Sequence, residues 1–87
     1  MQTIHKYPLR PVDEQEIYMP AGANLLTVQM QYGNPCLWAL VNPENALEKR
    51  RVRIYGTGHP IDGAVRYIST FQTHGGDLVY HAFEMVD

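Results

Sequence analysis

Glycine and proline interrupt this sequence so often that long helices are excluded. Seven glycines and six prolines divide the 87 residues into segments of about 6–10 residues, which is the usual length of β-strands. These segments predict strands over residues 3–7, 14–19, 24–32, 35–41, 50–56, 65–74 and 78–86. We therefore expect an all-β fold, a small antiparallel sandwich or half-open barrel of about seven short strands with one helical turn.

The helical turn is expected over residues 42–49. Asn42 is a residue type that caps helices, and Pro43 fits the first helical position. Glu44 lies early and Lys49 lies late in this stretch, as the helix dipole favours. The stretch is too short to be stable without contacts to the rest of the chain.

A two-residue loop at Gly33-Asn34 predicts a β-hairpin, because glycine at the first loop position suits a type II′ turn. This register places three apolar pairs on one face, which we expect to be the core. The opposite face is mixed and carries Trp38, so it suits a binding or subunit surface. The expected core pairs are Met30 with Leu37, Val28 with Ala39, and Leu26 with Val41.

A second hairpin is predicted at Gly75-Gly76, where positive φ at both positions suits a type I′ turn. Both faces of this strand pair carry large apolar side chains, and such a pair is usually covered on both sides. A second subunit is one source of that cover, so we expect a homo-oligomer. The expected pairs are Phe71 with Tyr80 and Thr73 with Leu78 on one face, and Gln72 with Val79, Thr70 with His81 and Ile68 with Phe83 on the other.

Length and composition exclude several classes of protein. The length allows a single domain over residues 1–87, and a hydrophobic content of 45% is enough for a folded core. No apolar run approaches the roughly 20 residues of a membrane span, and no signal peptide is evident, so we expect a cytoplasmic protein without a membrane partner. One cysteine excludes an internal disulfide, and a net charge of −2 argues against general nucleic-acid binding.

The segment from Arg50 to Gly63 is the strongest candidate for a binding site. In a strand, Arg51, Arg53 and Tyr55 point to the same side, which places two guanidinium groups beside a phenol ring. The following turn offers backbone N–H groups, a hydroxyl and an imidazole that can contact an anion. An equally simple alternative is that the arginines solvate an edge strand and the glycines only make a turn. The expected ligand-binding residues are Arg51, Arg53, Tyr55, Gly56, Thr57, Gly58, His59 and Trp38.

Metal binding and covalent catalysis have little support in the sequence. In the predicted hairpin His74 and His81 are roughly 13 Å apart, too far to share a metal ion. Ser69 lies in the middle of a strand, and Cys36 lies beside a hairpin turn with no basic neighbour, so both are expected to be structural. We assign no catalytic residue, no metal and no cofactor. An enzyme that uses His59 as acid or base is the weakest of the function classes considered.

Several sequence blocks resemble a family of small proteins of about this length, found in tailed phages and bacterial genomes and classed as a domain of unknown function. The blocks are PCLWALV at 35–41, RIYGTGHPI at 53–61, YISTFQTHGG at 67–76 and VYHAFE at 79–84, with further similarity at 6–9 and 19–23. Together they span nearly the whole chain. The resemblance implies a phage context, in which small proteins often act on the host and one class sequesters the nucleotide second messengers of bacterial immunity. That implication is an analogy between proteins and not a motif.

Two functions are therefore expected. The first is a non-enzymatic binder of a phosphate-bearing, nucleotide-like molecule, of the kind a phage uses to sequester an immune second messenger. The alternative is a phage accessory module that binds a host protein or has a structural role, with no small-molecule ligand. Under the first function Arg51 and Arg53 hold the anion, while Tyr55, His59 or Trp38 contacts the base.

Overall fold

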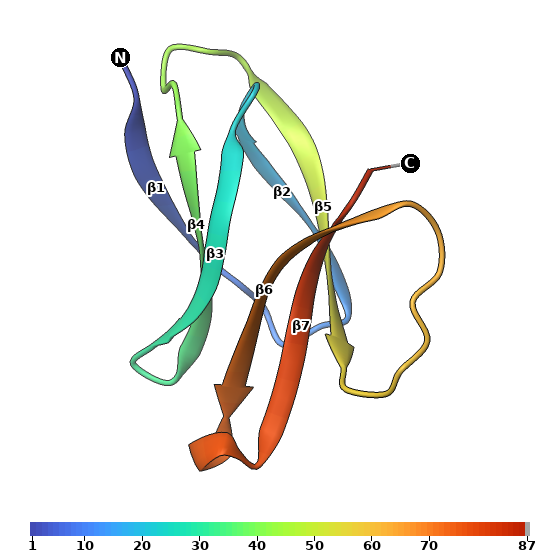
Figure 1. The fold of residues 1–87 in the computed structure, drawn as a ribbon. Coiled ribbons are helices and arrows are strands. Elements are labelled where there is room, and N and C mark those ends of the chain that lie inside the picture. Colours follow the sequence, from blue (N-terminus) through green and yellow to red (C-terminus); the bar gives the residue numbers. More distant parts are fainter. Residues whose placement is uncertain (87) are drawn as a thin grey trace.

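Seven antiparallel strands build the protein, as a computed structural model of residues 1–86 describes it. They form a three-stranded sheet in the order β1-β4-β3 and a four-stranded sheet in the order β2-β5-β7-β6 (Figure 1). The predicted all-β class is confirmed, and the two sheets do not close into a barrel. The strands are β1 (Thr3–Pro8), β2 (Glu14–Pro20), β3 (Asn24–Gln31), β4 (Asn34–Val41), β5 (Leu47–Gly56), β6 (Val65–Thr73) and β7 (Leu78–Met85).

The hydrophobic core lies between the two sheets. Alternation along β4 turns Leu37, Ala39 and Val41 inward, and none of the three is more than 1% exposed. The four-stranded sheet contributes Val52 and other apolar side chains to the same cluster. Two facing sheets with this alternation bury their apolar sides against each other, which is the packing of a β-sandwich.

Ser69 links the sheets where the edge strands β3 and β6 meet. Its hydroxyl donates a hydrogen bond of 2.9 Å to the carbonyl oxygen of Val28 and lies 3.1 Å from the hydroxyl of Thr27. The two sheets are thus joined here by a side-chain hydrogen bond, whereas the strands within each sheet are joined by backbone hydrogen bonds. The structural role expected for Ser69 is confirmed.

The β3–β4 hairpin forms, but its predicted register is wrong. The turn residues are Tyr32 and Gly33, which both have positive φ (49° and 81°) as in a type I′ turn. Val28 consequently lies opposite Leu37, two residues from the predicted partner. A shift of two residues keeps the same side chains on the inner face. The three predicted pairs, Met30–Leu37, Val28–Ala39 and Leu26–Val41, are therefore replaced by others.

The position predicted for Leu26 is also wrong, because the register of β3 shifts between Leu25 and Thr27. Such a bulge adds one residue to the strand and reverses the direction of the side chains beyond it. Leu25 therefore packs against the core, whereas Leu26 is 42% exposed. Simple alternation predicted the opposite.

The β6–β7 hairpin confirms most of its predicted register. Four of the five expected pairs occur, from Thr73–Leu78 to Thr70–His81. The connection is longer than two residues, because His74–Gly76 forms a 3-10 turn before β7 begins at Leu78. The fifth pair is wrong because a second bulge displaces Ile68, so that Tyr67 lies opposite Phe83.

The helical turn predicted over residues 42–49 does not form. Asn42 does act as expected of a capping residue, since its side chain accepts a hydrogen bond of 3.1 Å from the Glu44 backbone N–H. The chain makes only one turn there, and β5 begins at Leu47, opposite Pro20 of β2. Pairing with β2 extends β5 through Lys49 and overrides the local helical preference.

A buried ion pair lies on the inner side of the four-stranded sheet. Glu84 of β7 is only 5% exposed and accepts hydrogen bonds from Nε and Nη2 of Arg50 in β5. Arg50 Nη1 also donates to the carbonyl oxygen of Ala23 at 2.9 Å, so the guanidinium has three acceptors. The hydrogen bond with Glu84 raises the pKa of Arg50 above its ordinary value. This paired geometry satisfies two charges that would otherwise be costly to bury.

Candidate functional site

Arg51, Arg53 and Tyr55 lie on the outer face of the four-stranded sheet, on one side of β5 as the sequence predicted. In the register, Arg53 lies between Glu14 of β2 and Phe83 of β7. Tyr55 lies two pairs further along, opposite His81. The strand alternation thus turns two cations and a phenol ring away from the core.

An aromatic row extends from Arg53 across three strands. The Arg53 guanidinium carbon is 5.2 Å from the centre of the Tyr55 ring. Phe83 contacts Tyr55 edge to face at 5.6 Å and contacts Tyr67 of β6 in the same way at 5.4 Å. Tyr55 is 5% exposed, whereas Tyr67 is 56% exposed, so the row begins buried and ends at the surface. We call Arg51, Arg53, Tyr55, Phe83 and Tyr67 the arginine–aromatic face.

Two polar atoms in this face are buried without a hydrogen-bond partner. They are Nε of Arg53 and the hydroxyl of Tyr55, and no other buried side-chain nitrogen or oxygen of residues 1–86 lacks a partner. Folded proteins pair nearly all such atoms, because an unpaired one costs about 1–3 kcal/mol. Both atoms belong to residues that the sequence selected for binding.

Carboxylates from β2 lie near two cations of β5. Glu14 lies 3.8 Å from Nη1 of Arg53, and Glu16 lies 3.3 Å from the ammonium group of Lys49. These side chains are about half exposed, so each pair contributes little and can yield to a stronger anion. Arg53 therefore remains a cation that a phosphate can reach.

The turn after β5 closes one end of the face. The hydroxyl of Thr57 lies 2.7 Å from Nε2 of His81, and the hydroxyl of Thr70 lies 2.9 Å from Nδ1 of the same ring. Both nitrogens of His81 are thus engaged by hydroxyl groups. The predicted contact between His81 and Thr70 is confirmed.

Gly56 and His59 have a close packing relationship within the turn. The backbone N–H of His59 donates to the carbonyl oxygen of Gly56 at 3.1 Å, and Gly58 has a φ of +89°. A Cβ atom on Gly56 would lie 2.9 Å from Cε1 of His59, so the imidazole ring covers this glycine. Glycine at position 56 therefore leaves room for His59, a role that the sequence did not indicate.

Trp38 is not brought together with the other predicted site residues. It lies in β4 of the other sheet and alternates with the inward-facing Leu37 and Ala39, so it points away from the four-stranded sheet. The ammonium group of Lys6 is 5.9 Å from its ring centre. The sequence spacing predicted that Trp38 lies on the face of β4 opposite the core. It did not predict that β4 and β5 belong to different sheets.

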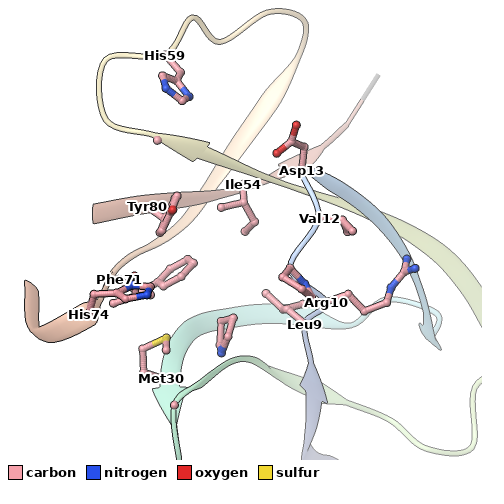
Figure 2. Close-up of a pocket in the computed structure, with 15 residues that line it drawn as sticks. Leu9, Arg10, Val12, Asp13, Met30, Ile54, His59, Phe71, His74 and Tyr80 are labelled. Atoms are coloured by element: carbon pink, nitrogen blue, oxygen red, sulfur yellow. Dashed lines mark hydrogen bonds between the residues drawn. The ribbon is translucent and has the colours of Figure 1, made fainter. Parts of the chain in front are cut away.

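A cavity of about 560 Å³ opens at the end of the sandwich, and the sequence did not indicate it. It includes Gly56 and His59 from the predicted site, but its other lining residues come from five separate segments (Figure 2). Its position depends on how the sheets diverge, which strand patterns cannot reveal. We call it the end cavity.

Neither metal ligation nor a membrane-spanning helix has support in the described part of the chain. No three His, Cys, Asp or Glu side chains of residues 1–86 gather where they could hold a metal ion. The same residues form no helix that is long and apolar enough to cross a membrane.

The comparisons with known proteins identify the family alone. Nothing matches among curated proteins or among solved structures. One family model, the domain of unknown function DUF7352, matches residues 1–87, which agrees with the family resemblance seen in the sequence blocks. Because the match extends over the whole chain, the protein belongs to the DUF7352 family.

Proposed function

We propose that the protein binds a phosphate-bearing, nucleotide-like small molecule at the arginine–aromatic face and does not transform it. The observation that carries this proposal is the pair of unpartnered buried atoms, Arg53 Nε and the Tyr55 hydroxyl. A phosphate supplies several strong acceptor oxygens, and a guanidinium group binds phosphate through parallel hydrogen bonds. The Arg53 side chain is half exposed and its guanidinium carbon lies 5.2 Å from the centre of the Tyr55 ring, so a phosphate bound to Arg53 would lie beside Tyr55.

The aromatic row would receive the base of the ligand. Tyr67 presents more than half of its surface to solvent and is held at an angle to Phe83. Stacking on such a ring is tolerant of the base and is worth about 1–3 kcal/mol. In this proposal Tyr67 contacts the base of the ligand, a role for which the sequence suggested Trp38. Arg51 and Arg53 hold the phosphate.

The wider setting of this function follows the family resemblance and is also a proposal. A phage-encoded homo-oligomer in the host cytoplasm would bind an immune second messenger and keep it from its receptor. Sequestration requires tight binding and an intact ligand on release. It does not require a nucleophile or a metal.

Native mass spectrometry with a ligand panel tests the proposal. The panel contains cyclic dinucleotides, cyclic trinucleotides and ADP-ribose derivatives. We expect a fixed ligand stoichiometry and an unchanged ligand mass after release. Arg53→Ala should weaken binding by about 10- to 150-fold, which corresponds to about 1.5–3 kcal/mol.

Arg10→Ala is the matched control, because Arg10 is also an exposed arginine but lies in the segment between β1 and β2. It should bind like the parent protein. Equal binding by Arg53→Ala would refute the site, and a protein that stays unliganded across the panel would refute the proposed ligand class.

A second candidate function, recognition of a host protein, has one observation in its favour. The outer side of the three-stranded sheet exposes Ile4, which is 55% exposed and lies opposite Leu40. Trp38 lies on the same side, so this sheet presents apolar side chains to solvent. Under this function Trp38→Ala should abolish capture of the partner from infected cells, while Arg51 and Arg53 variants should be silent.

A further inference from the structure

The end cavity lies where the two sheets diverge. The β3–β4 turn, the β6–β7 turn and the link from β1 to β2 all lie at this end of the molecule (Figure 1). The link crosses from one sheet to the other and is anchored by two backbone hydrogen bonds. Leu9 N–H donates to Pro35 at 2.9 Å, and Ile54 N–H donates to Asp13 at 2.8 Å. The cavity is thus bounded by backbone that is fixed to both sheets.

Its walls are the outer surface of the hydrophobic core. Leu9 and Phe71 belong to the core cluster, and Met30, Ile54 and Tyr80 pack against it. In Figure 2 these side chains surround the hollow from several strands. Protein interiors are normally close-packed, and a hollow of about 560 Å³ lies within the range of small-molecule sites. The walls therefore suit an apolar ring.

The lining of the cavity carries a negative charge. Asp13 and His59 both line the cavity, and Figure 2 shows them on the side away from Phe71 and Met30. The guanidinium group of Arg10 extends away from the cavity in the same view. No side chain within residues 1–86 makes a hydrogen bond or ion pair with the Asp13 carboxylate. Asp13 is the acidic side chain among the residues that line the cavity.

We propose that the end cavity binds a ring-bearing amine, with its apolar ring between Phe71, Ile54 and Met30 and its ammonium group on Asp13. A charged donor next to an unpaired carboxylate forms a stronger hydrogen bond than a neutral donor does. This site is separate from the arginine–aromatic face, which lies on the outer side of the sheet and selects anions. The two inferences therefore stand or fall independently.

Three indole compounds of similar size test the charge and the ring separately. Tryptamine carries an ammonium group, indole carries no charge, and indole-3-propionate carries a carboxylate. Titration of the ¹⁵N-labelled protein should move the amide signals of Ile54, Phe71 and Tyr80 and leave those of Arg53 and Tyr67 in place. We expect tryptamine to bind about 3- to 10-fold more tightly than indole, and indole-3-propionate to bind most weakly.

Two variants test whether the ammonium group contacts Asp13 and whether the compounds bind in the end cavity. Asp13→Asn keeps the backbone carbonyl that Ile54 uses and should reduce tryptamine binding to the level of indole. Val12→Trp adds a large side chain at the rim of the cavity without altering a buried residue. It should weaken the binding of all three compounds. Preserved amide dispersion shows that both variants are folded.

Three results would overturn the proposal. One is the absence of saturable shifts with any of the three compounds at millimolar concentration. Another is binding of indole-3-propionate as tight as that of tryptamine, and the third is an Asp13→Asn variant that keeps the tryptamine preference. Arg53→Ala should leave every one of these titrations unchanged, which separates failure here from failure of the proposed function.

Discussion

Replacing Glu84 with glutamine should destabilise the protein strongly, although the change is nearly isosteric. The carboxylate accepts two hydrogen bonds from Arg50, whose side chain is only 14% exposed. Glutamine keeps one acceptor oxygen, places an NH₂ group against the guanidinium, and leaves the buried positive charge poorly compensated. Breaking a buried pair in this way costs about 3–5 kcal/mol.

The lower end of that range applies here. Arg50 retains the carbonyl oxygen of Ala23 at 2.9 Å and the half-exposed carboxylate of Glu48 at 3.7 Å. A loss of about 3 kcal/mol is large against the total of about 4–13 kcal/mol expected for a chain of this length. It corresponds to a fall in Tm of about 12–24 °C.

Urea unfolding followed by the fluorescence of Trp38, the single tryptophan, measures this loss. Glu48→Gln is the control and should cost less than about 1 kcal/mol, because the pair with Glu48 is half exposed. The double variant Arg50→Met with Glu84→Leu should be more stable than Glu84→Gln, since it removes both charges. A Glu84→Gln protein within about 1 kcal/mol of the parent would refute this account of the pair.

Two further predictions concern Tyr7 and Tyr32. Burial raises the pKa of Tyr7 above 10.0. The phenol therefore ionises at a lower pH in the unfolded chain than in the folded protein. The stability that the protonated Tyr7 phenol contributes is complete below pH 10 and is lost as the pH rises through the folded-state pKa. Tyr7→Phe should therefore flatten the fall of the urea midpoint above pH 10, and an unchanged slope would contradict the assignment. Tyr32 is exposed with a φ of 49°, so Tyr32→Asn should raise the free energy of unfolding by about 0.5–1 kcal/mol, because asparagine tolerates this backbone conformation better. A lower melting temperature in calorimetry would show that the Tyr32 ring has a role which its exposure does not suggest.

The parts of the fold that the sequence predicted are those determined by short-range chemistry. Two consecutive glycines at 75–76 placed the β6–β7 turn, and alternation placed Arg51, Arg53 and Tyr55 on one face of β5. The β3–β4 register failed because Tyr32, a residue that rarely adopts positive φ, occupies a turn position. A turn residue without a turn preference leaves no trace in the local pattern.

The rest of the site depends on contacts between distant segments. The two bulges near Leu26 and Ile68 reverse which neighbouring side chains point inward, and alternation cannot locate them. The separation of Trp38 from Arg53 follows from the assignment of β4 and β5 to different sheets. The end cavity likewise arises only when the sheets are placed against each other, and the Glu84–Arg50 pair arises only when β5 pairs with β7.

The position of β7 between β5 and β6 has a consequence for biosynthesis. The ribosome completes both neighbours before it makes the strand that separates them, so each neighbour emerges with an unpaired edge. Glu84, the partner of Arg50, also arrives with β7. Until then Arg50 lacks its main acceptor, and β5 and β6 are open to wrong pairing with other chains. Folding of the four-stranded sheet during translation must therefore wait for β7, and a product that ends before this strand should aggregate or be degraded.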